Sequence, residues 1–339
     1  MDTPVDSKKA GKLQVVDFAR GFAIFTIVLM HLSIVLKLPG VLKNAVALGG
    51  AGVHVFILCS GFGLYLSHLK RPLDYPTFLR RRASRCYIPY LVAVLLWVAF
   101  GIAVSHRVNW QAVASHVFLY KMFDAKLDVS LCYYYWFIST IIQFYICWPI
   151  MLKLAQIRRG VAIGFAISLS WAALVGFLGL SESRPWGSCF LQYLWEFCLG
   201  MWLATKADLI EGQIAKLRYL TVALVAFVCL AASGAMGFIG GVLKLFNDIP
   251  SAFGYLACVV LIYKVGIRPV NRFFEFTSGF GYEWYLLHGL VFAILSKLFP
   301  GMPPVLNMAA SFVSSYACAF GVNLVLKKFR PQTRGVRPA

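Results

Sequence analysis

The sequence predicts an all-α protein: a polytopic transmembrane helical bundle of about ten helices, with both termini in the cytoplasm. Of the 339 residues, 60% are hydrophobic and only 13% are charged, which leaves too little polar surface for a soluble domain of this size. Apolar stretches long enough to cross a bilayer recur along the chain. The basic residues gather between these stretches, and most of them fall on one side of the bilayer.

Ten apolar windows have the length of a membrane-spanning helix, about 18 to 25 residues. With the N-terminus in the cytoplasm, the inner segments hold 23 of the 32 Lys and Arg residues and the outer segments hold eight. This asymmetry predicts a cytoplasmic tail over 1–13, a single transmembrane domain over 14–326 and a basic cytoplasmic tail over 327–339. The net charge of +19 then follows from loop topology, and no nucleic-acid partner is expected. The windows are 14–36, 46–67, 87–105, 131–152, 160–180, 187–205, 219–241, 251–267, 276–297 and 303–326.

The nine cysteines stand singly, and most of them lie inside apolar windows. No Cys-x-x-Cys or Cys/His ligand spacing occurs, so we expect no disulfide framework, no metal site and no bound cofactor. The first window contains Arg20 and lacks a small-residue cleavage site. We interpret it as an uncleaved first helix rather than a signal peptide.

That first window, VVDFARGFAIFTIVLMHLSI, carries Asp17, Arg20 and His31. At ~100° per residue, the step from Arg20 to His31 ends about 20° from three whole turns, so both side chains lie on one helix face. Asp17 lies on the same side, one turn before Arg20. In one interpretation, Asp17 and Arg20 are a capping pair near the membrane surface and His31 is a hydrogen-bonded interior histidine. In the other, all three face a functional interior, because ionisable groups in hydrocarbon are costly.

The stretch FLRRRASRCYIPYL places arginines at 80–82 and at Arg85 just before the third window. Such a cluster marks the cytoplasmic side or contacts anionic lipid headgroups. Guanidinium groups also bind phosphate bidentately, so the cluster can instead hold a phosphorylated donor such as coenzyme A. In the second window, Gly61 beside Ser60 allows either close helix packing or the approach of a ligand to the backbone.

Five motifs occur in order along nearly the whole chain. DFARGFAIFTIVLMH has the form D-x-x-R-G…H, and 78–89 has the form F-x-x-R-R-x-x-R-x-x-x-P. FILCSGF is similar to F-x-x-S-G-F, with one more residue between Phe56 and Ser60. YWFISTIIQFYICWPIM contains W-F and Q-F-Y-x-x-x-P, and GYEWYLLHGLVF contains Y-x-x-Y-L-x-H. Together they resemble the integral-membrane acyltransferase family three, which includes O-acetylases of surface polysaccharides.

The resemblance implies a membrane-bound O-acyltransferase that depends on acyl-CoA, used as a co-substrate. It implies transfer of an acyl group, most commonly acetyl in that family, to a sugar hydroxyl of an exopolysaccharide, an O-antigen or a lipid-linked glycan. The expected location is the cell inner membrane. The expected partners are membrane lipids, acyl-CoA, the glycan acceptor and proteins of polysaccharide biosynthesis. Arg20 and His31 match the essential residues of the family, and Arg82 and Arg85 match its donor-side arginines.

Acyl transfer to an alcohol needs a base near the hydroxyl, and His31 is the best candidate because its intrinsic pKa lies near neutrality. Arg20 is expected to orient the donor or to hold Asp17. The remaining candidates fall into two groups, one for the acyl-CoA donor and one for the acceptor side of the site. The donor group is Arg82, Arg85, Arg81, Ser60 and Gly61, and the acceptor group is His288, Tyr285, Trp136, Tyr145 and Glu196.

Other ionisable residues are open to more than one interpretation. A packed His288, bonded to a neighbouring helix, is as consistent with the sequence as a catalytic one. Glu196 is expected to pair with His31 or His288, and Glu283 with Arg20 or Arg272. The outer segment 105–130 is interpreted as an acceptor platform or as an interfacial aromatic belt. His68, His106 and His116 are expected in solvated loops.

The chain departs from the family pattern at two places: Ile141 and Ile142 replace common acidic residues, and His54 stands where an acidic or small residue is frequent. Two other classes of protein also fit parts of the sequence. A transporter or flippase for a polyprenyl-linked or anionic solute would line its pathway with Arg20 and the histidines, although the two halves of the chain show no repeat. A purely structural or sensory membrane protein would leave the charged first helix unexplained.

Overall fold

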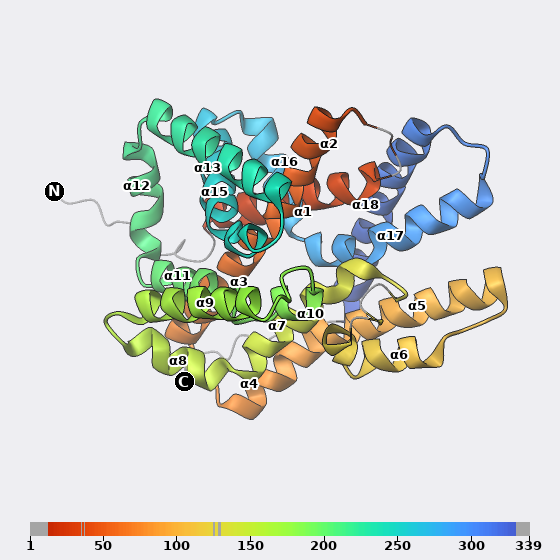
Figure 1. Ribbon diagram of the computed structural model, residues 1–339, viewed down its shortest axis with the longest axis horizontal. Helices are drawn as coiled ribbons and strands as arrows, with labels where there is room; N and C mark the ends of the chain where they lie inside the picture. Colours follow the sequence, from red (N-terminus) through yellow and green to blue (C-terminus); the bar gives the residue numbers. More distant parts are fainter. Residues whose placement is uncertain (1–12, 35, 37, 125, 128–129, 330–339) are drawn as a thin grey trace.

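The structure is a computed structural model that describes residues 13–34, 36, 38–124, 126–127 and 130–329. Most of the predicted tails, 1–13 and 327–339, therefore lies outside the described residues. Within them the chain is mainly helical and contains no strand (Figure 1). The predicted all-α class is confirmed.

Each of the ten apolar windows contains a helix. Seven spans among the described residues are long and apolar enough to cross a membrane, and a bent pair adds an eighth. The protein is therefore a multi-pass membrane protein. The helices in window order are α1 (Gln14–Ser33), α3 (Gly52–Lys70), α5 (Ile88–Ser105), α7 with α8 (Trp136–Ile146 and Trp148–Gln156), α9 (Gly160–Phe177), α11 (Leu194–Ala204), α13 (Tyr219–Ile239), α15 (Asp248–Val265), α17 (Gly281–Leu298) and α18 (Pro304–Phe329).

Two of the ten windows, 187–205 and 276–297, are not among the seven spans or the bent pair. In 276–297 the helix α17 carries Glu283 in its first turn and Lys297 in its last, which lowers its hydropathy. In 187–205 the helix is too short to cross a membrane. This helix, α11, has 11 residues, which at 1.5 Å per residue extend only about 16 Å. The residues before it form the short helix α10 (Arg184–Gly187) and a series of turns. Helix α11 is buried because it packs between α3 and α9.

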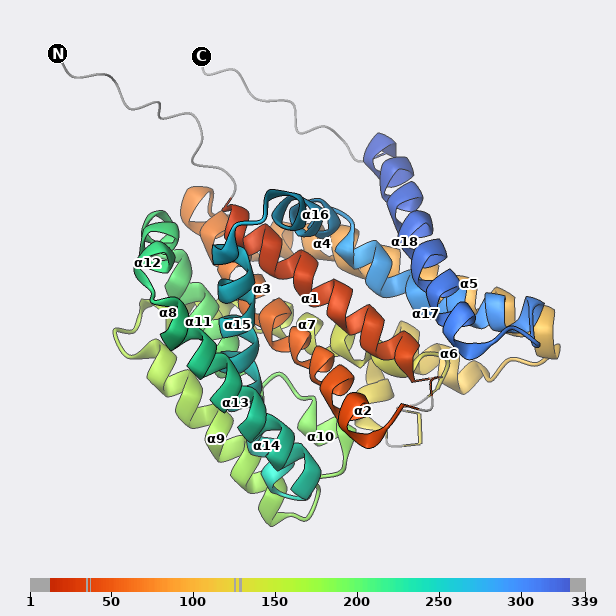
Figure 2. The ribbon, with the colours of Figure 1, turned by 90° about the horizontal axis from the view of Figure 1, so that it is seen from above.

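Short helices lie at the two ends of the bundle. Figure 2 shows α4 (Tyr75–Arg82), α12 (Ile210–Lys216) and α16 (Arg268–Ser278) at the end where α1 begins and α18 ends, which we call the inner end. At the opposite, outer end lie α2 (Gly40–Ala47), α10 and α14 (Leu243–Phe246). The segments at the inner end are the ones that the distribution of Lys and Arg assigns to the cytoplasm.

Glycines allow the central helices to approach closely. A Cβ atom on Gly61 would lie 2.2 Å from the carbonyl oxygen of Phe197, and one on Gly200 would lie 2.1 Å from that of Leu58. Helices α3 and α11 thus meet backbone to backbone. Gly61, which was predicted to help bind the donor, is buried against α11 and lines none of the cavities described below.

Two irregular segments interrupt the helices next to the functional region. Helices α7 and α8 meet at an angle of 63° around Cys147, where Pro149 lacks the N–H that a continuous helix would need. Residues Ala83–Tyr87 form a π-helix between α4 and α5, a rare form that is often found at functional sites.

Candidate active site

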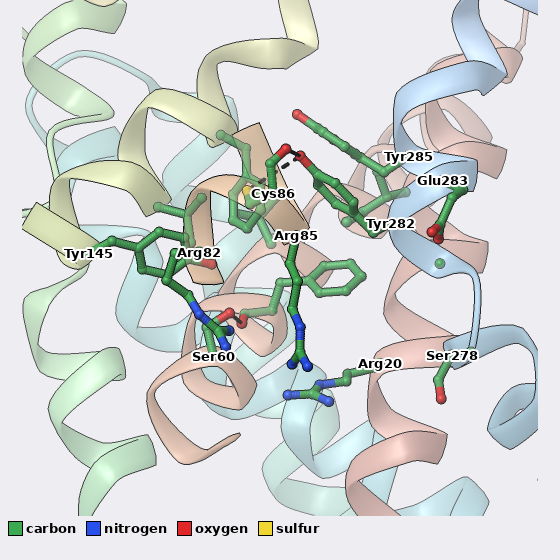
Figure 3. Close-up of a pocket in the computed structure, with 17 residues that line it drawn as sticks. Arg20, Ser60, Arg82, Arg85, Cys86, Tyr145, Ser278, Tyr282, Glu283 and Tyr285 are labelled. Atoms are coloured by element: carbon green, nitrogen blue, oxygen red, sulfur yellow. Dashed lines mark hydrogen bonds between the residues drawn. The ribbon is translucent and has the colours of Figure 1, made fainter. Parts of the chain in front are cut away.

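A cavity of about 380 Å³ opens near the inner end of the bundle, and we call it the arginine cavity. Arg20 enters it from α1, Arg82 from the end of α4 and Arg85 from the π-helix. Figure 3 shows the three guanidinium groups turned toward the same region, with Tyr145 on one side and Glu283 on the other. Arg20 lies 62 positions before Arg82 in the sequence, and the fold places these two cations and Arg85 around one space.

Two of the three arginines have neighbours that hold them in this position. The Arg20 Nη2 atom donates a hydrogen bond of 2.9 Å to the carbonyl oxygen of Cys59. Gly63 leaves room for this group, since a Cβ there would lie 2.7 Å from Nη2. The Arg82 guanidinium lies over the Phe78 ring at 5.7 Å, and its Nε is buried without a hydrogen-bond partner among the described residues. A buried donor of this kind is normally satisfied, so the cavity has unused capacity for an acceptor.

The rest of the cavity wall is mainly apolar and aromatic. Ile27, Phe56 and Phe137 line it together with Tyr285, and Ser60 lines it while donating a hydrogen bond of 2.7 Å to the carbonyl oxygen of Phe56. The predicted donor residues Arg82, Arg85 and Ser60 therefore come together with Arg20. Asp17 and Arg81 are not among the residues that line this cavity.

A second cavity of about 330 Å³ lies toward the outer end, and we call it the histidine cavity. His31, in the last turn of α1, and His288, on α17, both line it. Their rings are stacked nearly parallel, and His31 Nδ1 lies 3.0 Å from His288 Nε2. Residues 257 positions apart thus form one histidine pair.

The hydrogen bonds of the pair define which ring nitrogens carry protons. His288 Nδ1 lies 3.1 Å from the carbonyl oxygen of Trp284. A carbonyl only accepts, so His288 Nδ1 is the donor, and in the neutral ring His288 Nε2 is an acceptor. His31 Nδ1 therefore donates to it. The Nε2 atom of His31 is then the unprotonated nitrogen of a half-buried ring at the cavity wall.

Tyr134 packs against both histidines, and the sequence analysis missed it. Its ring lies 5.0 Å from that of His31 and 4.3 Å from that of His288. The Gly289 amide donates a hydrogen bond of 3.0 Å to its hydroxyl oxygen, and a Cβ on Gly289 would lie 2.2 Å from that atom. The only sequence signal was the run of three tyrosines before Trp136, which is equally typical of a membrane interface.

The outer segment before Tyr134 contains several buried polar residues, among them His116 and Lys121. His116, on α6 (Trp110–Val117), is fully buried and is not in the solvated loop predicted for it. Its Nε2 donates to the carbonyl oxygen of Ser130 at 2.9 Å, and its Nδ1 lies 2.9 Å from the Tyr90 hydroxyl. Burial lowers the pKa of His116 to about 4. The Lys121 ammonium donates to the carbonyl oxygen of Cys132 at 2.9 Å, so both residues hold the backbone that leads to Tyr134.

The other two histidines expected in loops also lie outside both cavities. His68 is half-buried in the last turn of α3 beside Tyr65 and Trp148, which corrects the prediction of a solvated loop. His106 is exposed at the end of α5, as predicted.

The arginine cavity and the histidine cavity share no lining residue. Helices α1 and α17 run from one to the other: Ile27 and Tyr285 line the first, and His31 and His288 line the second. The Tyr285 hydroxyl donates to the carbonyl oxygen of Tyr134. The partition between the cavities is therefore about one helical turn, or ~5 Å, along each helix.

Two acceptor-side candidates lie away from both cavities. Glu196 pairs with His54 at 2.8 Å, rather than with His31 or His288 as expected. Trp136 stacks on Tyr193 and lies beneath the Arg184 guanidinium. Tyr145 and Tyr285, by contrast, line the arginine cavity, and so does Glu283.

A comparison with protein families matched residues 13–324 of the chain to the model of the acyltransferase-3 family, described as an acyltransferase domain. Searches among curated proteins and among solved structures gave no match. The matched range includes all three arginines of the arginine cavity and both members of the histidine pair.

Proposed function

The chain belongs to the acyltransferase-3 family and is a membrane acyltransferase, and we propose that it transfers an acyl group from cytoplasmic acyl-CoA to a sugar hydroxyl. The acyl group proposed is acetyl. The acceptor proposed is a surface polysaccharide, such as an exopolysaccharide or O-antigen, or a lipid-linked glycan. The proposed location is the cell inner membrane, with the inner end of the bundle in the cytoplasm.

The arginine cavity supports binding of the donor. Coenzyme A carries several phosphate groups, and guanidinium groups bind phosphate through paired, charge-assisted hydrogen bonds. Arg20, Arg82 and Arg85 supply such groups, and the buried Nε of Arg82 is a donor without a partner. The apolar part of the wall suits the uncharged arm that carries the thioester. Arg20 is assigned to holding the donor, because it lies at the inner end, away from the histidine pair.

The histidine pair is the observation that carries the proposal. His31 Nε2 takes the proton of the acceptor hydroxyl as its oxygen attacks the thioester carbonyl carbon. The C–S bond then breaks, and the thiolate takes that proton from His31, which yields the ester and free coenzyme A. His288 accepts the Nδ1 hydrogen of His31 at 3.0 Å, which holds the ring and stabilises its charged form during transfer.

The partition sets a geometric requirement for this reaction. The thioester must pass from the arginine cavity to His31 across about one helical turn, at the level of Tyr134 and Tyr285. The hydrogen bond from the Tyr285 hydroxyl to the Tyr134 backbone lies at this level and joins α17 to the segment before α7. Transfer therefore requires these tyrosines to move apart by the width of an acyl arm.

Membranes that contain the protein, supplied with radiolabelled acetyl-CoA, test the proposal through label recovered in the glycan fraction. We expect His31→Ala to lower the transfer rate by about 10³-fold, within the range of general base catalysis. His106→Ala is the matched control, because His106 is an exposed histidine at the outer end of α5. Transfer at the wild-type rate by the His31 variant would exclude His31 as the base. Movement of a solute without any acetylated product would instead support a transporter.

A further inference from the structure

A third cavity, of about 360 Å³, lies at the outer end of the bundle, and we call it the outer polar cavity. It is bounded by the start of α3, the end of α13 and the start of α15, and it shares no lining residue with the other two. Its polar lining residues are His54, Ser233, Asn247, Asp248 and Ser251. Its volume lies in the range of pockets that bind small molecules.

One imidazole faces two carboxyl groups at the wall of this cavity. His54 Nδ1 lies 2.8 Å from Glu196 Oε1, and His54 Nε2 lies 3.7 Å from Asp248 Oδ1. Gln192 Nε2 donates to the other oxygen of Asp248 at 2.8 Å. The cluster joins α3, α11 and α15. It contains two acidic groups, Glu196 and Asp248, and only one group that can carry a positive charge, the His54 imidazole.

The carboxyl groups of the cluster have unused capacity for hydrogen-bond donors. Glu196 is fully buried, and its Oε2 atom has no partner among the described residues. The Asp248 side chain is 20% exposed and lines the cavity. Two of the 13 acidic residues of a strongly basic chain thus converge at one partly desolvated point. Such an arrangement is costly in a membrane protein and usually has a function.

The neighbouring hydroxyl groups also present acceptors. Ser251 donates to Asn247 Oδ1 at 3.0 Å, and the hydroxyls of Ser233 and Ser251 lie 2.7 Å apart. Because the Ser251 hydrogen is used on Asn247, Ser233 is the donor to Ser251. Both lone pairs of the Ser233 oxygen then remain for a ligand. The cavity combines a carboxylate with hydroxyl acceptors, and its charged cluster favours a cation.

We propose that the outer polar cavity binds a small solute carrying a primary ammonium group, such as an amino sugar. Asp248 is the counter-ion, and Ser233 accepts a hydrogen bond from the ligand. His54 and Glu196 hold Asp248 in place from the protein side. This site is separate from the acyl-transfer site and does not depend on the function proposed for it.

Thermal unfolding of the purified full chain in detergent tests the site with two pairs of probes. Glucosamine is compared with glucose, and methylammonium with methanol, at pH 7 and constant ionic strength. We expect the two ammonium probes to raise the melting temperature in a saturable way and the neutral probes to leave it unchanged. Equal effects of the charged and neutral members of both pairs would overturn the proposal.

Isosteric variants locate the effect. Asp248→Asn should weaken the binding that is measured from the melting temperature with the ammonium probes at least tenfold. Ser233→Ala leaves the charges of the cluster unchanged and should weaken this binding a few-fold. Glu182→Gln is the matched control, because Glu182 is an exposed acid at the outer end that pairs with Lys244 at 2.7 Å. If Asp248→Asn does not fold, the proposal is tested by comparing the responses of the melting temperature to the ammonium probes in Ser233→Ala and Glu182→Gln. An undiminished response in Ser233→Ala, or loss of the response in Glu182→Gln, would contradict the site.

Discussion

The arginine cavity and the histidine cavity use opposite means to make a polar site inside an apolar bundle. In the first, three permanent cations come from three segments, and a backbone carbonyl at 2.9 Å orients Arg20. In the second, two imidazoles bond to each other and aromatic rings surround them. Permanent positive charge is thus placed toward the inner end of the bundle, while the neutral imidazole pair lies among aromatic rings. Under the proposed function, donor binding and proton transfer would be separated along α1 and α17.

The largest effect after loss of His31 itself is expected at its partner. His288→Leu removes the acceptor for the Nδ1 hydrogen of His31, and we expect a fall in the turnover number of about 10²-fold with an unchanged KM for acyl-CoA. His288→Gln places an amide oxygen near the position of Nε2 and should recover at least a tenth of the lost rate. Steady-state kinetics with acetyl-CoA measure both. Equal rates in the two variants would show that His288 only fills space.

A change at Gly289 should damage the histidine cavity without altering any ionisable residue. Gly289→Ala would drive a Cβ to within 2.2 Å of the Tyr134 hydroxyl oxygen, so Tyr134 must leave its position on the histidine pair. We expect a ten- to hundredfold lower turnover number with little change in donor binding. Gly234→Ala is the control, since a Cβ there meets no neighbouring atom. A normal rate in the Gly289 variant would show that Tyr134 does not support the pair.

Substitutions in the arginine cavity should alter the KM for acyl-CoA more than the turnover number. Arg82→Gln and Arg85→Gln should each raise the KM for acyl-CoA about tenfold, with a smaller effect on turnover, because each removes a phosphate ligand. Arg81→Gln is the matched control, since Arg81 is adjacent in sequence but does not line the cavity. A KM that rises equally in all three variants would indicate a general effect of surface charge.

The smallest effect at neutral pH is expected at His116. Its pKa of about 4 lies below the ordinary 6.5, so between these values the unfolded chain binds a proton that the folded chain does not. Stability therefore falls as the pH drops from about 6.5 toward 4. His116→Gln should be close to wild type in rate at pH 7 and should lose less of its melting temperature between pH 7 and 5. If the melting temperatures of His116→Gln and the wild-type protein fell equally between pH 7 and 5, His116 would not be the source of this loss of stability.

The positions of the helices could be predicted from the sequence better than the contacts between side chains on different helices. Hydrophobic length located α1 and α13 to within a few residues, because every backbone polar group in lipid must be satisfied within the segment. It failed for α11, since a short helix buried among others is as apolar as a spanning one. Arg20, Arg82 and Arg85 were recognisable as cations in or beside apolar sequence.

The contacts within the site were beyond what the sequence could show. The partner of His31 depends on the rotation of α17 against α1, and one imidazole resembles another in the sequence. For the same reason the partner of Glu196 was predicted incorrectly: His54 is equally a histidine in an apolar window. Tyr134 was hidden among other aromatic residues, and only its distance of 4.3 Å from the His288 ring distinguishes it.

The π-helix Ala83–Tyr87 makes the chain sensitive to length at one point. A π-turn holds one more residue than an α-turn, and the residues on either side, Arg82 and Ile88, remain in regular helical geometry. Removing a single residue between them would restore the ordinary spacing and rotate everything upstream by about 100° relative to α5. Arg82 would then leave the cavity together with its neighbours. A one-residue deletion here, which changes neither charge nor hydropathy if Ala83 is lost, should therefore disturb the donor side more than any single replacement of an arginine.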